Sequence, residues 1–107
     1  MPDLPTVNPF RDLYDAAIRY GAIRLTCCRC RHQTIVSAVA LWYYYHKKGW
    51  ADRFREVQRR SICMVCWYEC GERVRMPDME FGDWEPTDTR FPMPSEFEWK
   101  AERRRRR

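Results

Sequence analysis

Two short cysteine stretches decide the fold of this chain: residues 27–32 read CCRCRH, and residues 61–66 read SICMVC. Each contains a Cys-x-x-Cys pair, Cys27 with Cys30 and Cys63 with Cys66. A two-residue spacer lets both sulfurs of a pair point at one ion, and two such pairs are the usual ligand set of a closed tetrahedral zinc site. We therefore predict that these four cysteines hold one structural Zn²⁺.

Two further cysteines and a histidine lie close to these pairs. Cys28 adjoins Cys27 too closely for both to serve in the same pair, and Cys70 lies where the chain should turn away from the site. We expect both to stay outside the ligand set. His32 falls two residues after Cys30 and remains an alternative ligand.

Six cysteines could instead form three disulfides, as in small secreted domains. However, residues 1–20 contain three prolines and several acids and lack the apolar stretch of a secretory signal. We therefore expect reduced thiols and a cytoplasmic protein. The longest apolar run, residues 35–45, is too short to span a bilayer, so no membrane association is expected.

The length of the chain allows one domain at most. Of 107 residues, only residues 1–76 show the apolar pattern of a packed core. A core of that size gives little folding stability unless a disulfide or a bound metal adds to it. A structural zinc contributes about 10–16 kcal/mol of apparent binding energy, which becomes folding energy because the unfolded chain has no formed site. We expect metal binding to decide whether the domain folds.

Composition divides the chain into three segments. These are a leader with a possible short helix (residues 1–21), a four-cysteine zinc-binding domain (residues 22–76) and a tail rich in proline, acids and aromatic residues (residues 77–107). The net charge is +6 over residues 1–76, −6 over residues 77–99 and +5 over residues 100–107. The total of +5 is therefore the sum of a basic core, an acidic first part of the tail and a basic end of the tail.

Hydrophobic spacing predicts a small α+β domain. Residues 22–27 alternate apolar and polar as a strand does, whereas Ala38, Leu41, Trp42 and Tyr45 share one face of a helix that begins after Ser37 and ends before Gly49. We interpret this aromatic stripe as core packing, with a base-stacking platform as the alternative. The expected order is helix 12–20, strand 22–27, strand 33–36, helix 37–48, helix 51–60 and strand 71–76.

The tail has the composition of a linker with aromatic anchors. We predict that it is largely disordered until a partner binds, although residues 95–98 match a capping box that could start a short terminal helix before the Arg103–Arg107 run. It could also fold back on the basic core and screen it. The candidate partner-binding residues are Phe81, Trp84, Phe91, Phe97 and Trp99.

The order of these features resembles small bacterial zinc-ribbon or zinc-finger-like four-cysteine proteins. The resemblance rests on the strand and first cysteine pair, Gly49-Trp50, residues 59–66 and Arg73-Val74, and it covers residues 22–76. It implies zinc-ribbon-like β-knuckles with an inserted two-helix unit, and binding to nucleic acid or to nucleic-acid machines. Arg31 and Trp67 stand where ribbon knuckles commonly have glycine.

Arginines give independent support for nucleic acid as a partner. Arginine outnumbers lysine 17 to 3, and its planar guanidinium favours phosphate contacts and base stacking. A solvated basic surface is the plainer alternative, and the choice between DNA and RNA stays open. The candidate nucleic-acid-binding residues are Arg24, Arg29, Arg31, Arg53, Arg55, Arg59, Arg60, Arg73 and Arg75.

Enzymatic activity is not expected. Four protein ligands leave zinc no open position for water or substrate, and neither histidine lies in the His-x-Glu pattern of zinc deaminases. We expect no small-molecule substrate. The alternative function is a protein-interaction adaptor, or a small subunit of a larger complex, that binds its partner through residues 77–107.

Overall fold

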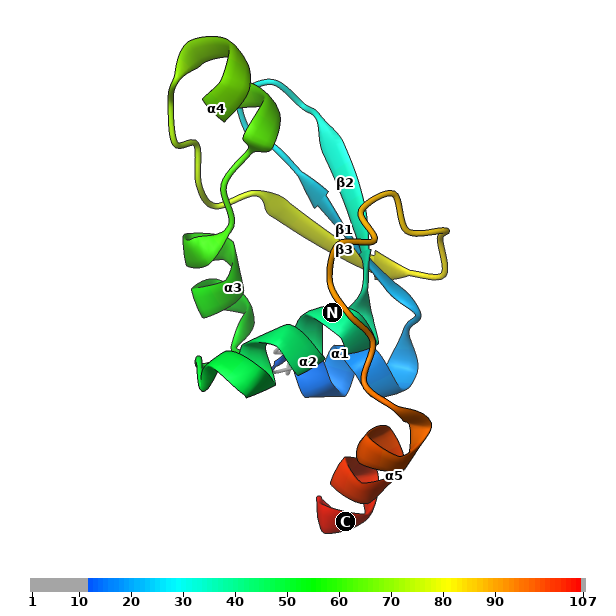
Figure 1. Cartoon of the computed structure of the whole chain (residues 1–107). Helices are drawn as coiled ribbons and strands as arrows, with labels where there is room; N and C mark the ends of the chain where they lie inside the picture. Colours follow the sequence, from blue (N-terminus) through cyan, green and yellow to red (C-terminus); the bar gives the residue numbers. More distant parts are fainter. Residues whose placement is uncertain (1–11, 107) are drawn as a thin grey trace, which may run out of the picture.

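The computed structural model describes residues 12–106 and shows a small α+β fold (Figure 1). Residues 1–11, which hold most of the predicted leader, and residue 107 lie outside the described part. Among the described residues, no helix is long and apolar enough to cross a membrane. The elements are α1 (Leu13–Arg19), β1 (Ala22–Thr26), β2 (Gln33–Ser37), α2 (Ala38–Lys48), α3 (Phe54–Arg60), α4 (Met64–Cys70), β3 (Asp78–Gly82) and α5 (Glu96–Arg105).

The sheet is antiparallel, with the strand order β2-β1-β3. The predicted strands at residues 22–27 and 33–36 are confirmed as β1 and β2. The predicted closing strand at residues 71–76 is wrong, because this segment makes only an isolated bridge between Ile62 and Arg75. The third strand of the sheet is β3, which pairs with β1 from Thr26 opposite Asp78 to Ala22 opposite Gly82.

Strand β3 lies in the segment that was predicted to be disordered, and that prediction is wrong. Met79 and Phe81 pack against the core, whereas Asp78 and Glu80 are exposed. This is the period-two alternation of a strand with one buried face. The acids and prolines around β3 give residues 77–99 the composition of a linker. Nevertheless, Met79 and Phe81 bury one face of β3, and its backbone pairs with β1.

The core lies between the sheet and helices α1 and α2. The four residues of the predicted face of α2 are all buried, and Trp42 is only 3% exposed, so the interpretation of the aromatic stripe as core packing is confirmed. On α3, Val57 is fully buried and Phe54 partly buried. Ser37 caps α2 by accepting a hydrogen bond from the backbone N–H of Ala40.

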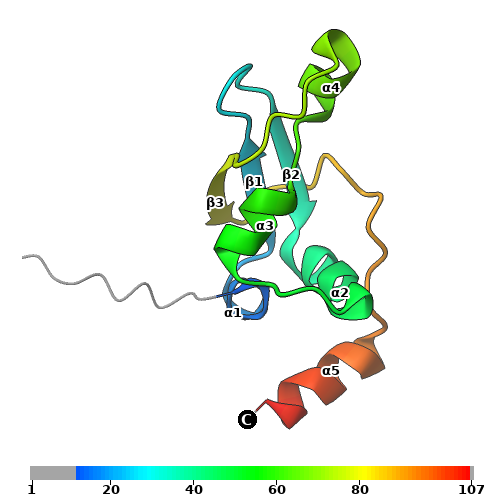
Figure 2. The same cartoon turned by 90° about the vertical axis from the view of Figure 1, so that its left-hand side faces the viewer.

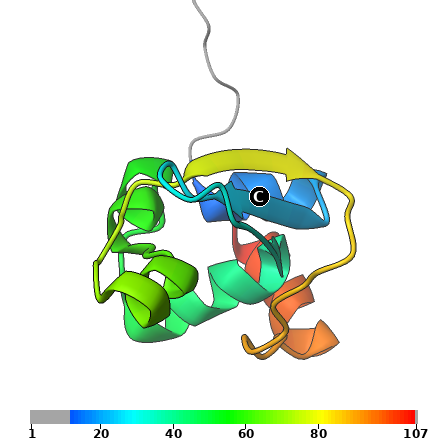
Figure 3. The ribbon, with the colours of Figure 1, turned by 90° about the horizontal axis from the view of Figure 1, so that it is seen from above.

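Residues 83–95, here called the strap, connect β3 to α5 and run beside the sheet (Figures 1 and 3). The backbone N–H groups of Thr87 and Asp88 donate to the carbonyl of Ile35, at 2.8 and 3.0 Å. The hydroxyl of Thr87 accepts from the N–H of Ile35 at 2.9 Å. The strap is therefore held along the outer edge of β2.

Helix α5 is held mainly by aromatic side chains. Trp99 meets the rings of Trp42 and Tyr14, with centroids 5.0 and 5.8 Å apart, and the guanidinium of Arg106 lies 4.1 Å from the Tyr14 ring centroid. The capping box at its start forms as the sequence indicates. Helices α4 and α5 lie at opposite ends of the molecule (Figures 1 and 2). The C-terminal part of the chain is thus helical and docked.

Replacing Trp42 by alanine should remove most of the stability of the fold. Truncation of a buried tryptophan costs about 3–5 kcal/mol, because the transfer energy is lost and a cavity remains. Urea unfolding of the full chain measures this change. Tyr68→Ala is the control, since that side chain is 78% exposed and its loss should change the unfolding free energy by less than about 0.5 kcal/mol. Equal effects of the two variants would contradict the described core.

The buried carboxylate of Glu102 should make the stability of the fold depend on pH. The guanidinium of Arg105, against the effect of burial and with the help of Arg106, holds the pKa of Glu102 below its ordinary value. Its stabilising contribution is present above the unfolded pKa of about 4.3 and is lost as the pH falls through the lower folded pKa.

Glu102→Gln should therefore lower the melting temperature at pH 7, and the difference from the unchanged chain should disappear by about pH 2. Thermal unfolding at several pH values checks this expectation. The matched control on the same helix is Glu96→Gln, because Glu96 is exposed and pairs with Lys100 across one helical turn. A difference that persists at low pH would show that the loss does not come from the carboxylate charge.

Candidate functional site

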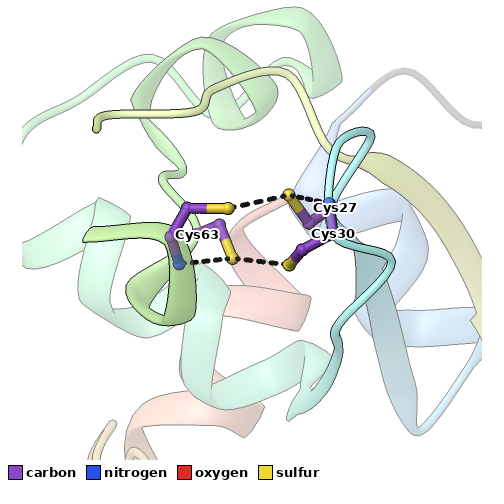
Figure 4. A group of neighbouring side chains, drawn as sticks. Cys27, Cys30 and Cys63 are labelled. Atoms are coloured by element: carbon purple, nitrogen blue, oxygen red, sulfur yellow. Dashed lines mark hydrogen bonds between the residues drawn. The ribbon is translucent and has the colours of Figure 1, made fainter. Parts of the chain in front are cut away.

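Four cysteine sulfurs from the two predicted pairs meet at one point of the structure. The Sγ atoms of Cys27, Cys30, Cys63 and Cys66 all lie within 4.8 Å of one another. The Sγ of Cys27 is 3.8 Å from that of Cys66, and the Sγ of Cys30 is 3.5 Å from that of Cys63. Figure 4 shows the side chains of Cys27 and Cys30 facing that of Cys63.

These distances fit a tetrahedral zinc site. Zinc–sulfur bonds of about 2.3 Å at tetrahedral angles place neighbouring sulfurs about 3.8 Å apart. The measured separations of 3.5 and 3.8 Å lie close to that value and far from the bond length of about 2.0 Å in a disulfide. The four clustered cysteines could therefore hold a metal ion such as zinc.

The first pair sits in the turn between β1 and β2. The backbone N–H groups of Arg29 and Cys30 point at the sulfur of Cys27, at 3.4 and 3.5 Å. Arg31, at the position where ribbon knuckles commonly have glycine, has a φ of +66° in the left-handed region. The turn therefore keeps the backbone conformation of a tight knuckle, with an arginine in it.

The second pair is placed by a helix, which corrects the prediction of two ribbon-like β-knuckles. Cys63 is the N-cap of α4, and its sulfur accepts the backbone N–H of Cys66 at 3.4 Å, as a serine or aspartate oxygen would at this position. Cys66 then lies in the first turn of α4. Trp67 follows it with ordinary helical geometry, so no glycine is needed there.

The pKa values of Cys27, Cys63 and Cys66 are shifted in different directions. Burial acts to raise the pKa of Cys27, but the backbone N–H groups of Cys30 and Arg29 favour its thiolate and bring the pKa to about 6. Burial raises the pKa of Cys66, and the neighbouring sulfurs raise it further; burial also raises the pKa of Cys63. Four thiolates this close need a cation among them, which a divalent metal supplies.

The remaining candidate ligands lie outside the cluster. Cys28 is exposed, and its sulfur lies 3.7 Å from the carbonyl oxygen of Arg75. Cys70 is exposed at the last position of α4. His32 contributes its backbone carbonyl to the turn by accepting the N–H of Cys27 at 2.9 Å, and its side chain is not among the clustered groups of the described residues.

The arginines around the sheet are paired with acids. Arg24 meets Glu80 of β3 at 3.0 Å and lies 4.3 Å from the centroid of the Trp84 ring, which in turn packs against Gly82. Two more ion pairs join Arg29 to Glu72 and Arg31 to Asp78. These acids are distant in sequence, so reasoning from the sequence had no local signal for the pairs.

A different group of arginines gathers beside α3. The guanidinium of Arg75 donates to the backbone carbonyl of Arg59 at 3.3 Å, which places residues 71–76 alongside α3. Within this group, the only acidic pairing that the described residues show is between Arg59 and Glu56, at 3.2 Å. We call this group the α3 arginine surface; its members, all exposed, are Arg55, Arg59, Arg60, Arg73 and Arg75.

Arg53 precedes α3 as its N-cap residue and pairs through its backbone with Asp12.

Two members of the α3 arginine surface lie against aromatic rings. The guanidinium of Arg60 is 4.1 Å from the Trp50 centroid, and that of Arg73 is 5.3 Å from the Trp67 centroid. Such pairing holds a guanidinium in place while leaving its charge uncompensated.

Most of the aromatic residues predicted to bind a partner are used within the fold. Phe81 meets Phe54 with centroids 4.9 Å apart, Phe91 meets Tyr44 at 5.0 Å, and Trp84 lies beneath Arg24. Trp99 packs on Trp42 as described above. Phe97 alone of the five is largely exposed, at 76%.

A pocket that the sequence analysis did not foresee lies beside the cysteine cluster. It has a volume of about 620 Å³ and is bounded by residues of β2, α2, the segment 60–64 and the strap. Its residues come from five parts of the chain, within the ranges 25–36, 41–50, 60–64, 74–77 and 88–92. Only the local aromatic density of residues 42–50 hinted at it, and that stripe was assigned to the core.

Neither models of known protein families nor curated proteins nor solved structures match this chain. The motif resemblance to zinc-ribbon proteins therefore identifies no family. The site stands on its own geometry: a cluster of four cysteines that suggests a zinc-binding site, joined by a basic surface along α3.

Proposed function

We propose that this chain is a non-enzymatic module, stabilised by one structural Zn²⁺, that binds nucleic acid through the α3 arginine surface. The observation that carries the proposal is the hydrogen bond from Arg75 to the carbonyl of Arg59. It sets two arginine-bearing segments side by side. All five arginines of the surface are exposed, and one of them, Arg59, is paired with an acid.

The structural role of the metal follows from the ligand set. Four cysteines fill the coordination of zinc, so no position stays open for water or substrate. Helix α4 makes few contacts with the other elements, and its first turn supplies two of the four sulfurs. The ion would therefore hold this helix and the α3 arginine surface in position.

The chemistry of the surface suits a phosphate backbone. Guanidinium groups bind phosphate oxygens in pairs and stack on bases, and each phosphate neutralised releases counterions. Arginines that already face carboxylates contribute less to such binding. The proposed interface therefore keeps five of the nine residues predicted from sequence. Arg24, Arg29 and Arg31 face acids, and Arg53, which precedes α3 as its N-cap residue, is not part of the surface.

The adaptor alternative is weaker in this structure. It relied on a free tail whose aromatic residues could dock on a partner. Four of those five residues contact other parts of the same chain, and the tail forms β3 and α5. Phe97 is too small an apolar surface to support stable association by itself.

Zinc should be present at one equivalent per chain in protein purified under reducing conditions, as measured by elemental analysis. Cys63→Ser should release the metal and unfold the domain, because the lost binding energy of about 10–16 kcal/mol exceeds the stability of a small fold. Circular dichroism after treatment with a chelator gives a second measurement of the same coupling.

Cys28→Ser and Cys70→Ser are the matched controls. Both cysteines are exposed and lie outside the cluster, so both variants should keep the metal and the fold. Metal-free protein that stays folded, or Cys63→Ser protein that keeps its zinc, would refute the structural site.

Removing two charges from the α3 arginine surface should weaken nucleic-acid binding and its salt dependence together. We choose Arg55→Gln with Arg73→Gln, because neither arginine faces a carboxylate among the described residues and neither lines the pocket. For a single-stranded 12-nucleotide probe, the slope of log K against log salt should become less steep by about 1.4, at about 0.7 for each phosphate that is no longer neutralised. Fluorescence anisotropy from 50 to 200 mM salt measures it.

Lys100→Gln with Arg104→Gln is the control of equal charge on α5. If the surface is local, this variant should bind nearly as well as the unchanged chain. Equal losses from both double variants would mean that binding follows net charge and not this surface. Absence of binding by the unchanged, zinc-loaded chain at 50 mM salt would reject the proposed function.

A further inference from the structure

The pocket beside the cysteine cluster has a buried floor and an exposed rim. Its floor includes Val36, Leu41 and Tyr45, which are at most 5% exposed, while Arg60 and Arg75 at its edge are exposed. The volume of about 620 Å³ falls within the range of roughly 300–1,000 Å³ that is usual for small-molecule sites. The pocket can therefore take a ligand the size of a nucleotide.

Four aromatic rings line the pocket: Tyr44, Tyr45, Trp50 and Phe91. They meet edge to face, with angles of 78° between Tyr44 and Trp50 and 66° between Tyr44 and Phe91. Among residues 12–106, no ring stacks in parallel on Tyr44 or Phe91. The Nζ of Lys48 lies over the Tyr44 ring, 5.6 Å from its centroid, whereas no cation of the described residues lies over Phe91. The flat surface of Phe91 can therefore stack on a planar ligand, as aromatic platforms do for unpaired bases.

The charge of the lining favours an anion. Arg60, Arg75 and Arg90 border the pocket, and its acidic residue, Asp88, is held by the guanidinium of Arg90 at 2.7 and 2.9 Å. Two of these cations, Arg60 and Arg75, also belong to the α3 arginine surface. The pocket thus opens where the proposed phosphate path passes.

Another part of the lining is unsuited to phosphate, although it adjoins Arg75, since the backbone N–H of Cys63 donates to the carbonyl of Val74 at 3.0 Å. Cys27 and Cys63 line it, and four thiolates around a divalent ion carry a net charge of about −2. A phosphate is therefore expected at the Arg60 and Arg75 edge, with the uncharged base directed inward among the aromatic rings.

We propose that this pocket receives one unstacked base of a single-stranded nucleic acid, with the phosphate of that nucleotide bound at Arg60 and Arg75. This inference rests on the proposed function, and it adds a preference for single strands, because a base within a duplex cannot enter the pocket. The sequence pattern predicted that Tyr45 and its neighbours belong to the core. In the structure they also line this cavity.

The first experiment titrates the full-length, zinc-loaded chain with uridine 5′-monophosphate and follows proton–nitrogen NMR spectra. The indole N–H of Trp50, assigned with Trp50→Phe, and the backbone N–H of Phe91 should shift and saturate. Ribose 5-phosphate is the control ligand, since it carries the phosphate without a base. Equal shifts with both ligands would show a phosphate site alone and would overturn the inference.

The second experiment compares Phe91→Leu with Phe97→Leu in binding the single-stranded probe. The loss of one stacking ring should weaken binding by between about fivefold and 100-fold for Phe91→Leu, with the salt slope unchanged. Phe97→Leu changes an exposed ring outside this pocket and should bind normally. Zinc content and melting temperature confirm that both variants are folded.

The outcomes separate the two proposals. If the probe binds with the slope expected for the α3 arginine surface, but uridine monophosphate leaves Trp50 unchanged and Phe91→Leu binds normally, the pocket inference fails and the function stands. If uridine monophosphate saturates the pocket while no oligonucleotide binds, the pocket is a free-nucleotide site and the proposed function fails. If neither ligand binds, both proposals are wrong.

Discussion

The constraint on which the structure depends is the meeting of two thiol pairs that lie 33 positions apart at Cys30 and Cys63. One pair is carried by the turn between β1 and β2, and the other by the first turn of α4. Since α4 makes few contacts elsewhere, the cluster is its main attachment to the sheet. The position of the cysteine cluster therefore sets the course of the chain from α3 to β3. It also sets where the arginines at residues 59–75 lie.

The acidic segment at residues 77–99 neutralises part of the positive charge of the same chain. Strand β3 brings Glu80 and Asp78 beside Arg24 and Arg31, so the basic side of the sheet is largely neutralised. Exposed ion pairs of this kind contribute little stability individually. The apolar contacts of Met79, Phe81 and Trp99 stabilise the docked segment more, through the apolar area that they bury. Among the described residues, four of the five arginines of the α3 arginine surface have no acidic partner.

This distribution links the two proposals. Arg60 and Arg75 belong both to the α3 arginine surface and to the edge of the aromatic pocket, which lies next to the candidate metal centre. A ligand with a charged backbone and a flat apolar group matches all three features. Because β3 pairs with β1, removing everything after Met76 would take a strand out of the sheet. Roles of the C-terminal part are therefore better separated by single substitutions than by truncation.

The sequence alone determined the elements whose signals are local. The cysteine spacing identified the four clustered residues, the Ser37 and Gly49 boundaries predicted α2, and the capping box marked the start of α5. Each of these signals depends on residues within one or two turns of backbone. The alternation of β1 was readable for the same reason.

Only the tertiary structure decided how distant segments pair. Residues Asp78–Gly82 have the composition of a linker because of their acids. They nevertheless pair with β1, whose second edge was free to accept another strand. Arg24 and Arg29 face carboxylates 56 and 43 positions away, which no local pattern indicates. The pocket likewise exists only where α2, the second cysteine pair and the strap converge. Non-local pairing and packing depend on the path of the whole chain, and here the cysteine cluster sets that path.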